Sequence, residues 1–284
     1  MGIFSDVLLT VDYDRTLTAI DSSIPERNLE AIRYFTENGG AFTVNTGRSL
    51  PMTAVFRDIV PVNAPLLLYN GSAAYDLRAG RLTFTHTIDL DMQDMVRACM
   101  NQFPDVDLEV QGLDAHYCFQ DQGCWEAYSQ AQKCAYAYAA DGMDYGPFIK
   151  ISLYGQIRGV TVAQLHEATD QELARMDEAE RWLRETYGHK CEVFRAAKRI
   201  IDVHAKGVSK IRTARELQAH LGRKILVCVG DAHNDIPMLE GADYAFVPAD
   251  AVLADRFETV CDCGDGAVAD VIYKKIPKIL ELCP

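Results

Sequence analysis

Four short clusters of polar residues lie at the ends of predicted strands and helices in this 284-residue sequence. They are Asp12-Tyr13-Asp14-Arg15-Thr16, Thr46-Gly47-Arg48, Lys210, and Gly230-Asp231-Ala232-His233-Asn234-Asp235. Ligands of open α/β sheets bind at the carboxyl ends of the strands. Residues two apart in an extended segment face the same way, so we expect the carboxylates of Asp12 and Asp14 to converge on one site.

The residue types in these clusters indicate phosphate chemistry assisted by a metal ion. Several carboxylates at one edge repel one another, and ligands that are all oxygen favour Mg²⁺ over zinc as the neutralising cation. A lysine, a hydroxyl and a backbone N–H beside glycine form a phosphate cradle. One carboxylate can attack phosphorus and form an aspartyl-phosphate. A second can protonate the leaving oxygen and later activate water.

Each cluster taken singly also has a purely structural interpretation. Asp12 and Asp14 could cap a loop, and Thr46 with Gly47 could form an ordinary turn. Asp231 and Asp235 could cap a helix. Lys210 favours a functional site, because the first turn of a helix disfavours a cation and an anion bound nearby accounts for its position. The four clusters together, in this order, favour the functional interpretation.

Both ends of the chain alternate strands and helices. Apolar runs predict strands at 7–11, 41–44, 66–69, 225–229 and 244–247, with a short one near 259. Helices are predicted from Ser23, acting as the capping residue, to Gly39, and over 209–221, 237–240 and 267–282. Strand-helix-strand units in sequence imply a parallel sheet with helices on its faces.

The middle of the chain has a different pattern. Helices are predicted over 92–103, 124–139 and 171–187, and short strands over 107–111, 116–119, 148–154, 191–194 and 200–203. Paired strands joined by tight turns predict an α+β module inserted into the α/β one. We therefore expect a Rossmann-like α/β core over 1–84 and 198–284 and an inserted α+β domain over 85–197.

Composition excludes several classes of partner. The chain has 28 Lys and Arg against 41 Asp and Glu, a net charge of −13. Such a surface repels nucleic acid and anionic membranes. Nine irregularly spaced cysteines, no signal-peptide pattern and no apolar stretch of about 18 residues predict free thiols in a cytoplasmic protein.

The ordered clusters resemble those of the haloacid dehalogenase superfamily, in particular Cof-type phosphatases with a large type IIB cap. The family's D-x-D-x-T motif matches Asp12 to Thr16, and its Thr-Gly-Arg motif matches Thr46 to Arg48. A G-V-S-K context surrounds Lys210, and G-D-x-x-N-D matches Gly230 to Asp235. The resemblance covers the whole chain and implies a core domain carrying a cap between the second and third motifs.

The resemblance implies a role for each matched residue. Asp12 would be the nucleophile and a Mg²⁺ ligand, and Asp14 the general acid/base, whose carbonyl also binds the metal. Asp231 would complete the protein ligands of the metal. Asp235 would support these ligands from the layer of residues behind them. The transferring phosphoryl group would be held by Thr46, Gly47, Lys210 and Asn234.

Two features fall outside the shared motifs. Close relatives usually have Gly where Arg15 stands, and we expect this side chain to point to solvent rather than into the leaving-group pocket. The cap would exclude water and contact the leaving group. Arg195, Arg199 and His204 are weak candidates for that contact, and a solvated strand face is expected for at least two of them.

The predicted activity is Mg²⁺-dependent hydrolysis of small phosphorylated metabolites such as sugar phosphates, through an aspartyl-phosphate. Alternatives are a phosphomutase of the same superfamily, a phosphorylation-dependent receiver, or a regulatory protein that binds a phosphorylated ligand without turnover. Receivers are less than half this length and lack a cap. Retention of both Asp12 and Asp14 argues against lost turnover. The sequence leaves the oligomeric state open.

Overall fold

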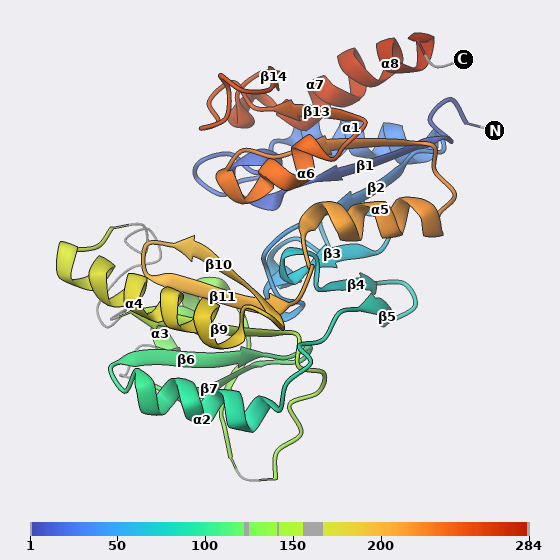
Figure 1. Ribbon diagram of the computed structural model, residues 1–284. Helices are drawn as coiled ribbons and strands as arrows, with labels where there is room; N and C mark the ends of the chain where they lie inside the picture. The colour runs from blue at the N-terminus through green and yellow to red at the C-terminus, as the bar shows by residue number, and fades with distance from the viewer. Residues whose placement is uncertain (1, 122–124, 141, 156–166, 283–284) are drawn as a thin grey trace. The chain divides into compact units, whose positions relative to one another are not determined.

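The computed structural model describes residues 2–121, 125–140, 142–155 and 167–282, which divide into two compact units. Unit 1 comprises Met1–Gly47, Phe56–Phe84 and Ser209–Pro284, and unit 2 comprises Arg48–Val55 and Thr85–Val208. The chain therefore leaves unit 1 between Gly47 and Arg48, directly after one of the polar clusters. Figure 1 traces both units.

Unit 1 is built on a five-stranded parallel sheet in the order β14-β13-β12-β1-β2. The strands are β1 (Val7–Val11), β2 (Ala41–Val44), β12 (Ile225–Val229), β13 (Tyr244–Val247) and β14 (Glu258–Thr259). The register pairs Val11 with both Val44 and Val229, so β12, β1 and β2 end at one level. Buried β-branched and leucine side chains fill these strands, as a sheet covered on both faces requires.

Helices pack on both faces of this sheet (Figure 1). They are α1 (Glu26–Glu37), α5 (Lys210–His220), α6 (Ile236–Glu240), α7 (Ala267–Asp270) and α8 (Ile276–Leu282), with a π-helical turn joining α7 to α8. α5 and α6 share one apolar cluster with the sheet through Leu217, Met238 and Leu226. The prediction that Ser23 caps α1 was wrong. The helix begins at Glu26 after Pro25, and the Ser23 hydroxyl donates to Asp21 at 2.6 Å.

A second sheet of unit 1 has the order β3-β4-β5, with β3 (Leu66–Leu68), β4 (Ala73–Asp76) and β5 (Arg81–Thr85). The third predicted strand is present as β3, but it pairs antiparallel with β4 and meets the parallel sheet only through a bridge between Asn45 and Leu67. It ends at Leu68 because Tyr69 adopts a positive φ of 53°. The half-buried β4 and β5 were not predicted.

Unit 2 is an α+β module with a six-stranded sheet in the order β10-β11-β9-β6-β7-β8. Its strands are β6 (Val106–Gln111), β7 (His116–Gln120), β8 (Tyr136–Tyr138), β9 (Lys150–Gly155), β10 (Cys191–Ala197) and β11 (Ile200–Ala205). All neighbouring pairs are antiparallel except β7 with β8. The helices are α2 (Met92–Gln102), α3 (Trp125–Gln132) and α4 (Asp170–Tyr187). Buried side chains of α2, α4 and the sheet, including Val96, Leu183 and Leu153, form the core of the unit.

The predicted helix over 124–139 was too long. Position 124 lies outside the described residues, and α3 ends at Gln132, where Lys133 takes a positive φ of 51°. Tyr136–Tyr138 then forms β8 beside His116 to Cys118. The tertiary pairing overrides the apolar spacing that suggested a continuous helix.

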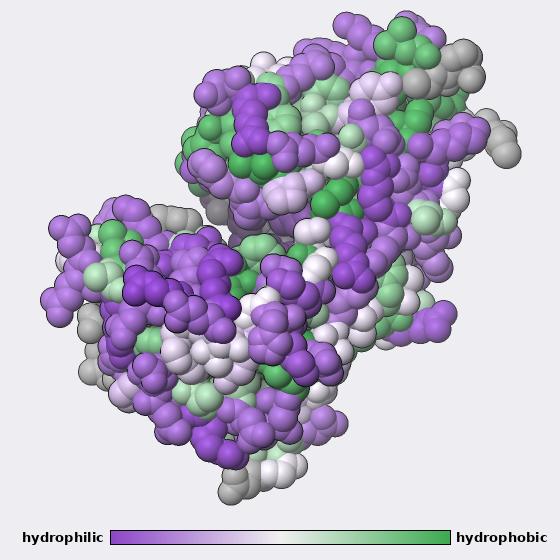
Figure 2. Space-filling model, viewed as in Figure 1, coloured by the Kyte–Doolittle hydropathy of each residue, from purple (hydrophilic) through white to green (hydrophobic). Residues whose placement is uncertain are grey.

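None of the described helices has the length and apolar character needed to cross a bilayer. Hydrophilic side chains predominate on the face drawn in Figure 2. The predicted α/β core carrying an α+β cap domain is confirmed.

Candidate active site

The site begins where β1 and β12 end. The Asp12 amide donates to the Val229 carbonyl at 2.9 Å and continues the ladder between the two strands for one more residue. On the other side of β1, the Asn45 amide donates to the Val11 carbonyl at 2.8 Å. Three of the predicted polar clusters therefore start at the same edge of the sheet.

Lys210 brings the fourth cluster to this edge. Its Nζ lies 2.6 Å from Asp12 Oδ1 and 2.6 Å from Asp235 Oδ1, and its side chain is almost completely buried. Ser209 caps α5 by accepting a hydrogen bond from the Arg212 amide at 3.3 Å. The lysine is therefore fixed in the first helical turn, between two carboxylates from different strand ends.

A glycine allows α5 to come this close. Gly71 has a φ of +96°, and a Cβ at this position would lie 2.4 Å from the Ser209 carbonyl oxygen. The Thr213 hydroxyl also donates to the Gly71 carbonyl. Asn45 holds the same helix from the strand side, because its amide Nδ2 donates to the Lys210 carbonyl at 3.0 Å. Sequence reasoning missed Gly71 and also Asn45, although Asn45 directly precedes the Thr46-Gly47-Arg48 cluster.

Asp235 turns back onto its own loop. Its Oδ2 accepts hydrogen bonds from the Asp231 amide at 3.1 Å and the Ala232 amide at 3.2 Å. Gly230 makes room for it, since a Cβ there would lie 2.7 Å from the Asp235 Cβ. With Oδ1 bonded to Lys210, both oxygens of Asp235 are engaged. Asp235 therefore holds Lys210 and the 230–235 loop in place.

Asp12, Asp231 and Asp235 form a buried acidic cluster, because each offers a carboxylate oxygen within 4.8 Å of the others. Asp231 Oδ1 accepts a hydrogen bond from the Thr16 hydroxyl at 3.2 Å. Among the described residues, the Oδ2 atoms of Asp12 and Asp231 have no hydrogen-bond partner. Two carboxylate oxygens left over beside a lysine are hard donors that suit Mg²⁺. The donor set therefore fits a hard divalent cation such as the predicted ion.

Burial and mutual repulsion shift the charges of this cluster. Burial raises the pKa of Asp12 well above its usual value. Lys210 counteracts this shift, and Asp235 and Asp231 add to it. Burial and then Asp235 raise the pKa of Asp231 to about 6. Burial would lower the pKa of Lys210, but the two carboxylates outweigh it and raise the pKa. The cluster therefore gains from any further positive charge.

Asp14 and Arg15 lie on a tight turn over 13–17, in which Asp14 keeps an extended backbone with φ −75° and ψ 126°. Asp14 is half-buried, and its charge contributes to the raised pKa of Asp12. β1 ends at Val11, so both residues follow the strand, and their convergence on one site stays a prediction. Arg15 is exposed, as expected, and adopts a positive φ of 59°. That backbone conformation suits glycine, the residue usual in the resembled family.

The remaining predicted phosphate ligands lie on flanking loops. Thr46 is buried, its amide donates to the Leu67 carbonyl at 2.9 Å, and its carbonyl accepts from the Asn70 amide at 3.0 Å. Gly47 packs against the Asn70 side chain, whose Oδ1 would lie 2.8 Å from a Cβ at that position. Asn234 is exposed in the short turn His233–Asp235.

The three weak candidates of unit 2 have structural partners. Arg199 pairs with both oxygens of Glu172 at 2.7 Å, and Arg195 pairs with Asp177 at 2.7 Å. His204 is fully buried, and burial lowers its pKa. The solvated strand face expected for at least two of the three was wrong, because Arg199, in the turn between β10 and β11, and His204, on β11, are both buried.

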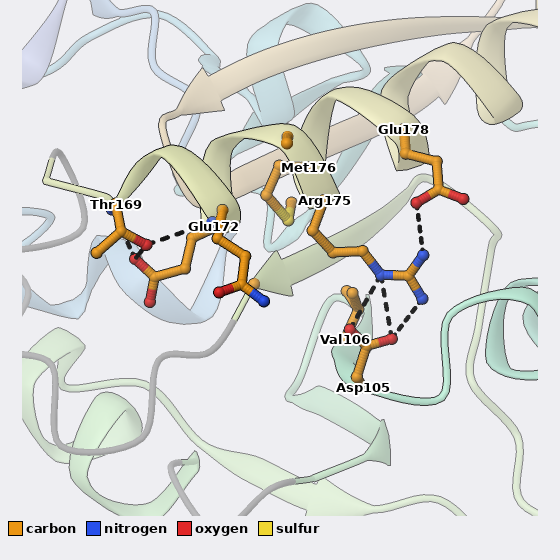
Figure 3. A pocket seen from close by; sticks show the side chains of 10 residues that line it. Asp105, Val106, Thr169, Glu172, Arg175, Met176 and Glu178 are labelled. Atoms are coloured by element: carbon orange, nitrogen blue, oxygen red, sulfur yellow. Dashed lines mark hydrogen bonds and ion pairs between the residues drawn. The ribbon is translucent and has the colours of Figure 1, made fainter.

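A cavity of about 410 Å³ lies in unit 2 and shares no residue with the acidic cluster. It is lined by α4 and the start of β6 (Figure 3). Its charged side chains are already paired. Arg175 points toward Asp105 and Glu178, and Glu172 points toward Thr169. We therefore assign the candidate active site to the acidic cluster.

A family model supports this assignment. The model for haloacid dehalogenase-like hydrolases matches residues 9–253. The chain belongs to this family. The matched range of the hydrolase includes all four polar clusters.

Solved structures share the fold of this hydrolase. A haloacid dehalogenase-like hydrolase from Bacteroides thetaiotaomicron has a TM-score of 0.78 at 16% identity, covering 93% of this chain and 97% of that chain. A relative from B. subtilis has a TM-score of 0.72 at 18% identity, covering 94% and 99%. A subclass IIB sugar phosphatase of the superfamily has a TM-score of 0.71 at 18% identity, covering 93% and 97%. The fold of the hydrolase therefore extends over both units.

Proposed function

We propose that this hydrolase is a Mg²⁺-dependent phosphatase of small phosphorylated metabolites such as sugar phosphates, acting through an aspartyl-phosphate. The observation that carries the proposal is Lys210, held between Asp12 and Asp235 at 2.6 Å from each, beside the free oxygens of Asp12 and Asp231. Family membership and the subclass IIB sugar phosphatase among the similar folds support the substrate class.

Asp12 is the proposed nucleophile. The Lys210 ammonium holds its carboxylate at Oδ1. One carboxylate oxygen of Asp12 attacks phosphorus, and the other is a proposed ligand of Mg²⁺ together with Asp231. The new bond joins the attacking oxygen to phosphorus while the bond from phosphorus to the leaving oxygen breaks, and Asp14 donates a proton to that oxygen. Bound Mg²⁺ supplies positive charge that neutralises the acidic cluster and the phosphate oxygens.

The phosphoryl group is held by side chains from three loops. The Lys210 ammonium, the Thr46 hydroxyl, the Gly47 backbone and the Asn234 amide are its proposed donors. Transferring phosphoryl groups spread negative charge over their equatorial oxygens, so fixed donors stabilise the transition state. In the second half of the reaction, Asp14 takes a proton from water, which then attacks phosphorus and releases Asp12 and inorganic phosphate.

Unit 2 is the proposed cap that selects the leaving group. This assignment rests on its position in the chain, between the Thr46 cluster and Lys210, and on the α+β fold of the module. A cytoplasmic location of the protein stays a prediction. A small-molecule substrate, rather than nucleic acid, also stays a prediction.

The test is release of inorganic phosphate from sugar phosphates and other small monoesters, with Mg²⁺ and with excess EDTA. We expect release that requires Mg²⁺ and falls below detection in Asp12→Asn. Asp89→Asn is the matched control, because Asp89 is exposed and, among the described residues, its carboxylate pairs with Lys190 at 3.4 Å. Wild-type rates in Asp12→Asn would remove Asp12 as nucleophile. Activity only with a bisphosphate primer would favour a mutase.

A further inference from the structure

One face of the unit 2 sheet is apolar and the other is polar. Side chains alternate along a strand, so in β6 Leu108 and Val110 enter the core with α2 and α4 while Glu109 and Gln111 lie on the opposite face. Ser152 of β9 is on this second face, where its hydroxyl donates to Asp202 of β11 at 2.8 Å. These polar side chains are almost completely buried, so the polar face is an internal layer of the protein.

Within this layer, Ser49, His116 and Glu109 form a continuous hydrogen-bonded chain. The Ser49 hydroxyl lies 2.6 Å from His116 Nε2, and His116 Nδ1 lies 3.1 Å from Glu109 Oε2. The other oxygen of Glu109 accepts hydrogen bonds from Tyr154 and Gln111, both at 2.7 Å. Ser49, His116 and Glu109 are each at most 1% exposed.

The series of hydrogen bonds from Ser49 through His116 to Glu109 has the connectivity of a hydrolytic triad, but it cannot activate the serine as a triad does. Burial would lower the pKa of His116, but Glu109 and the Cys134 thiol raise it to about 9. The ring is therefore a cation at neutral pH, so both nitrogens donate and neither can take a proton from Ser49. Ser49 is also fully buried. The hydrogen-bonded series instead fixes the position of Ser49, because the charged His116 ring donates a hydrogen bond to the Ser49 hydroxyl.

The anchored residue comes directly after the proposed phosphate cradle. Thr46 and Gly47 end a segment of unit 1, and Arg48–Val55 belongs to unit 2. Arg48 is held as well, because its Nη1 donates to Gln132 Oε1 at 3.4 Å. The backbone that carries Thr46 is thus fixed on one side by the sheet of unit 1 and, three residues later, by Ser49.

We propose that His116 is a positioning residue for the phosphate cradle, acting through its hydrogen bond to Ser49. The inference rests on the proposed role of Thr46 and Gly47 in binding phosphate. Loss of the bond releases the chain after Gly47, so the Thr46 hydroxyl and the Gly47 amide spend less time in the binding geometry. The expected effect is weaker binding of phosphate itself.

Two substitutions of His116 separate its two hydrogen bonds. The amide of His116→Gln reaches the position of Nε2 and keeps the donor to Ser49, whereas the shorter amide of His116→Asn reaches the position of Nδ1 and keeps only the donor to Glu109. Both variants lose the buried cation, so they share its effect on folding. A difference between them therefore reports the bond to Ser49.

The measurement is binding of inorganic phosphate by the whole protein with Mg²⁺, followed by calorimetry. We expect His116→Asn and Ser49→Ala to raise Kd about tenfold, the equivalent of one hydrogen bond of ~1.4 kcal/mol. His116→Gln and Ser49→Thr should bind nearly as the wild type does. Ser152→Ala is the matched control, since it removes a buried hydroxyl of the same polar face that does not contact the 48–55 segment.

The outcomes distinguish this inference from the proposed function. Wild-type Kd in Ser49→Ala, or an equal loss in Ser152→Ala, would overturn the positioning role. Wild-type protein that binds phosphate but hydrolyses no monoester would refute the phosphatase while leaving the positioning role in place. Wild-type protein that binds no phosphate would overturn both. If neither His116 variant folds, the comparison of Ser49→Ala with Ser49→Thr decides.

Discussion

Replacing Lys210 with methionine tests the electrostatic design of the site. At an effective dielectric constant of about 20, each of its two contacts at 2.6 Å is worth about 6 kcal/mol, and burying the ammonium offsets much of this. Lys210→Met keeps the length of the side chain and leaves Asp12 and Asp235 buried without their cation. Removing one partner of a buried ion pair typically costs about 3–5 kcal/mol. We expect a loss of this size in the free energy of unfolding at pH 7.5.

The loss of unfolding free energy in Lys210→Met should become smaller as the pH falls. Lys210 lowers the pKa values of Asp12 and Asp231, so both rise further in the variant. A carboxyl whose pKa is higher in the folded than in the unfolded protein binds its proton preferentially when folded. Stability therefore increases as the pH drops from the folded pKa, about 6 for Asp231 in the wild type, toward the ordinary aspartate pKa of 3.8. The variant should recover part of its loss by pH 5.

The assay is urea unfolding followed by circular dichroism at pH 7.5 and pH 5.0, in EDTA so that bound metal makes no contribution. Lys224→Met is the control, because Lys224 is 75% exposed and pairs with Asp6 at 2.9 Å. An exposed pair of this kind contributes at most about 1 kcal/mol. If Lys210→Met loses no more than Lys224→Met, or loses equally at both pH values, the assignment of Lys210 as the neutralising cation is refuted.

Three further predictions follow from single contacts. Asp231→Asn should raise the Mg²⁺ concentration for half-maximal phosphate release at least about tenfold, since a neutral amide replaces a charged ligand; an unchanged Mg²⁺ titration would contradict this. Arg15→Gly should stabilise the fold to urea by about 1 kcal/mol, because φ is 59° there, while Arg15→Ala should not. The pKa of His116 rises from 6.5 to about 9 on folding, so its contribution of about 3 kcal/mol is complete below pH 6.5 and is lost as the pH rises through 9. Urea unfolding across this range should show that loss in the wild type and not in His116→Gln.

Much of unit 1 could be predicted because its signals are local. The bounds of β1, β2, β12 and β13 follow from short apolar runs that end at a polar residue, a glycine or a proline. The position of Lys210 in the first turn of α5 follows from the Ser209 cap and the helical spacing after it. Ordered motifs then indicated which strand ends meet, because parallel strands carry their carboxyl ends to one edge.

Pairing partners and burial were harder to predict because they depend on distant segments. β8 is a strand only because β7 lies beside it, and β3 turns away from the parallel sheet because β4 pairs with it. A solvated strand face was expected for at least two of Arg195, Arg199 and His204, but Arg199 and His204 are buried. The 13–17 turn gives Arg15 a positive φ of 59°, which no spacing rule for strands could show.

By itself, the sequence determined the α/β core with its inserted module and the residues of the acidic cluster. These follow from periodicity, apolar runs and motif order, all of which act over a few residues. Only the tertiary structure decided that Lys210 bridges Asp12 and Asp235, and that Ser49 joins His116 and Glu109 in unit 2. Such contacts join residues far apart in the chain. Their geometry depends on how strands pair and which side chains lose contact with water, and neither property is local.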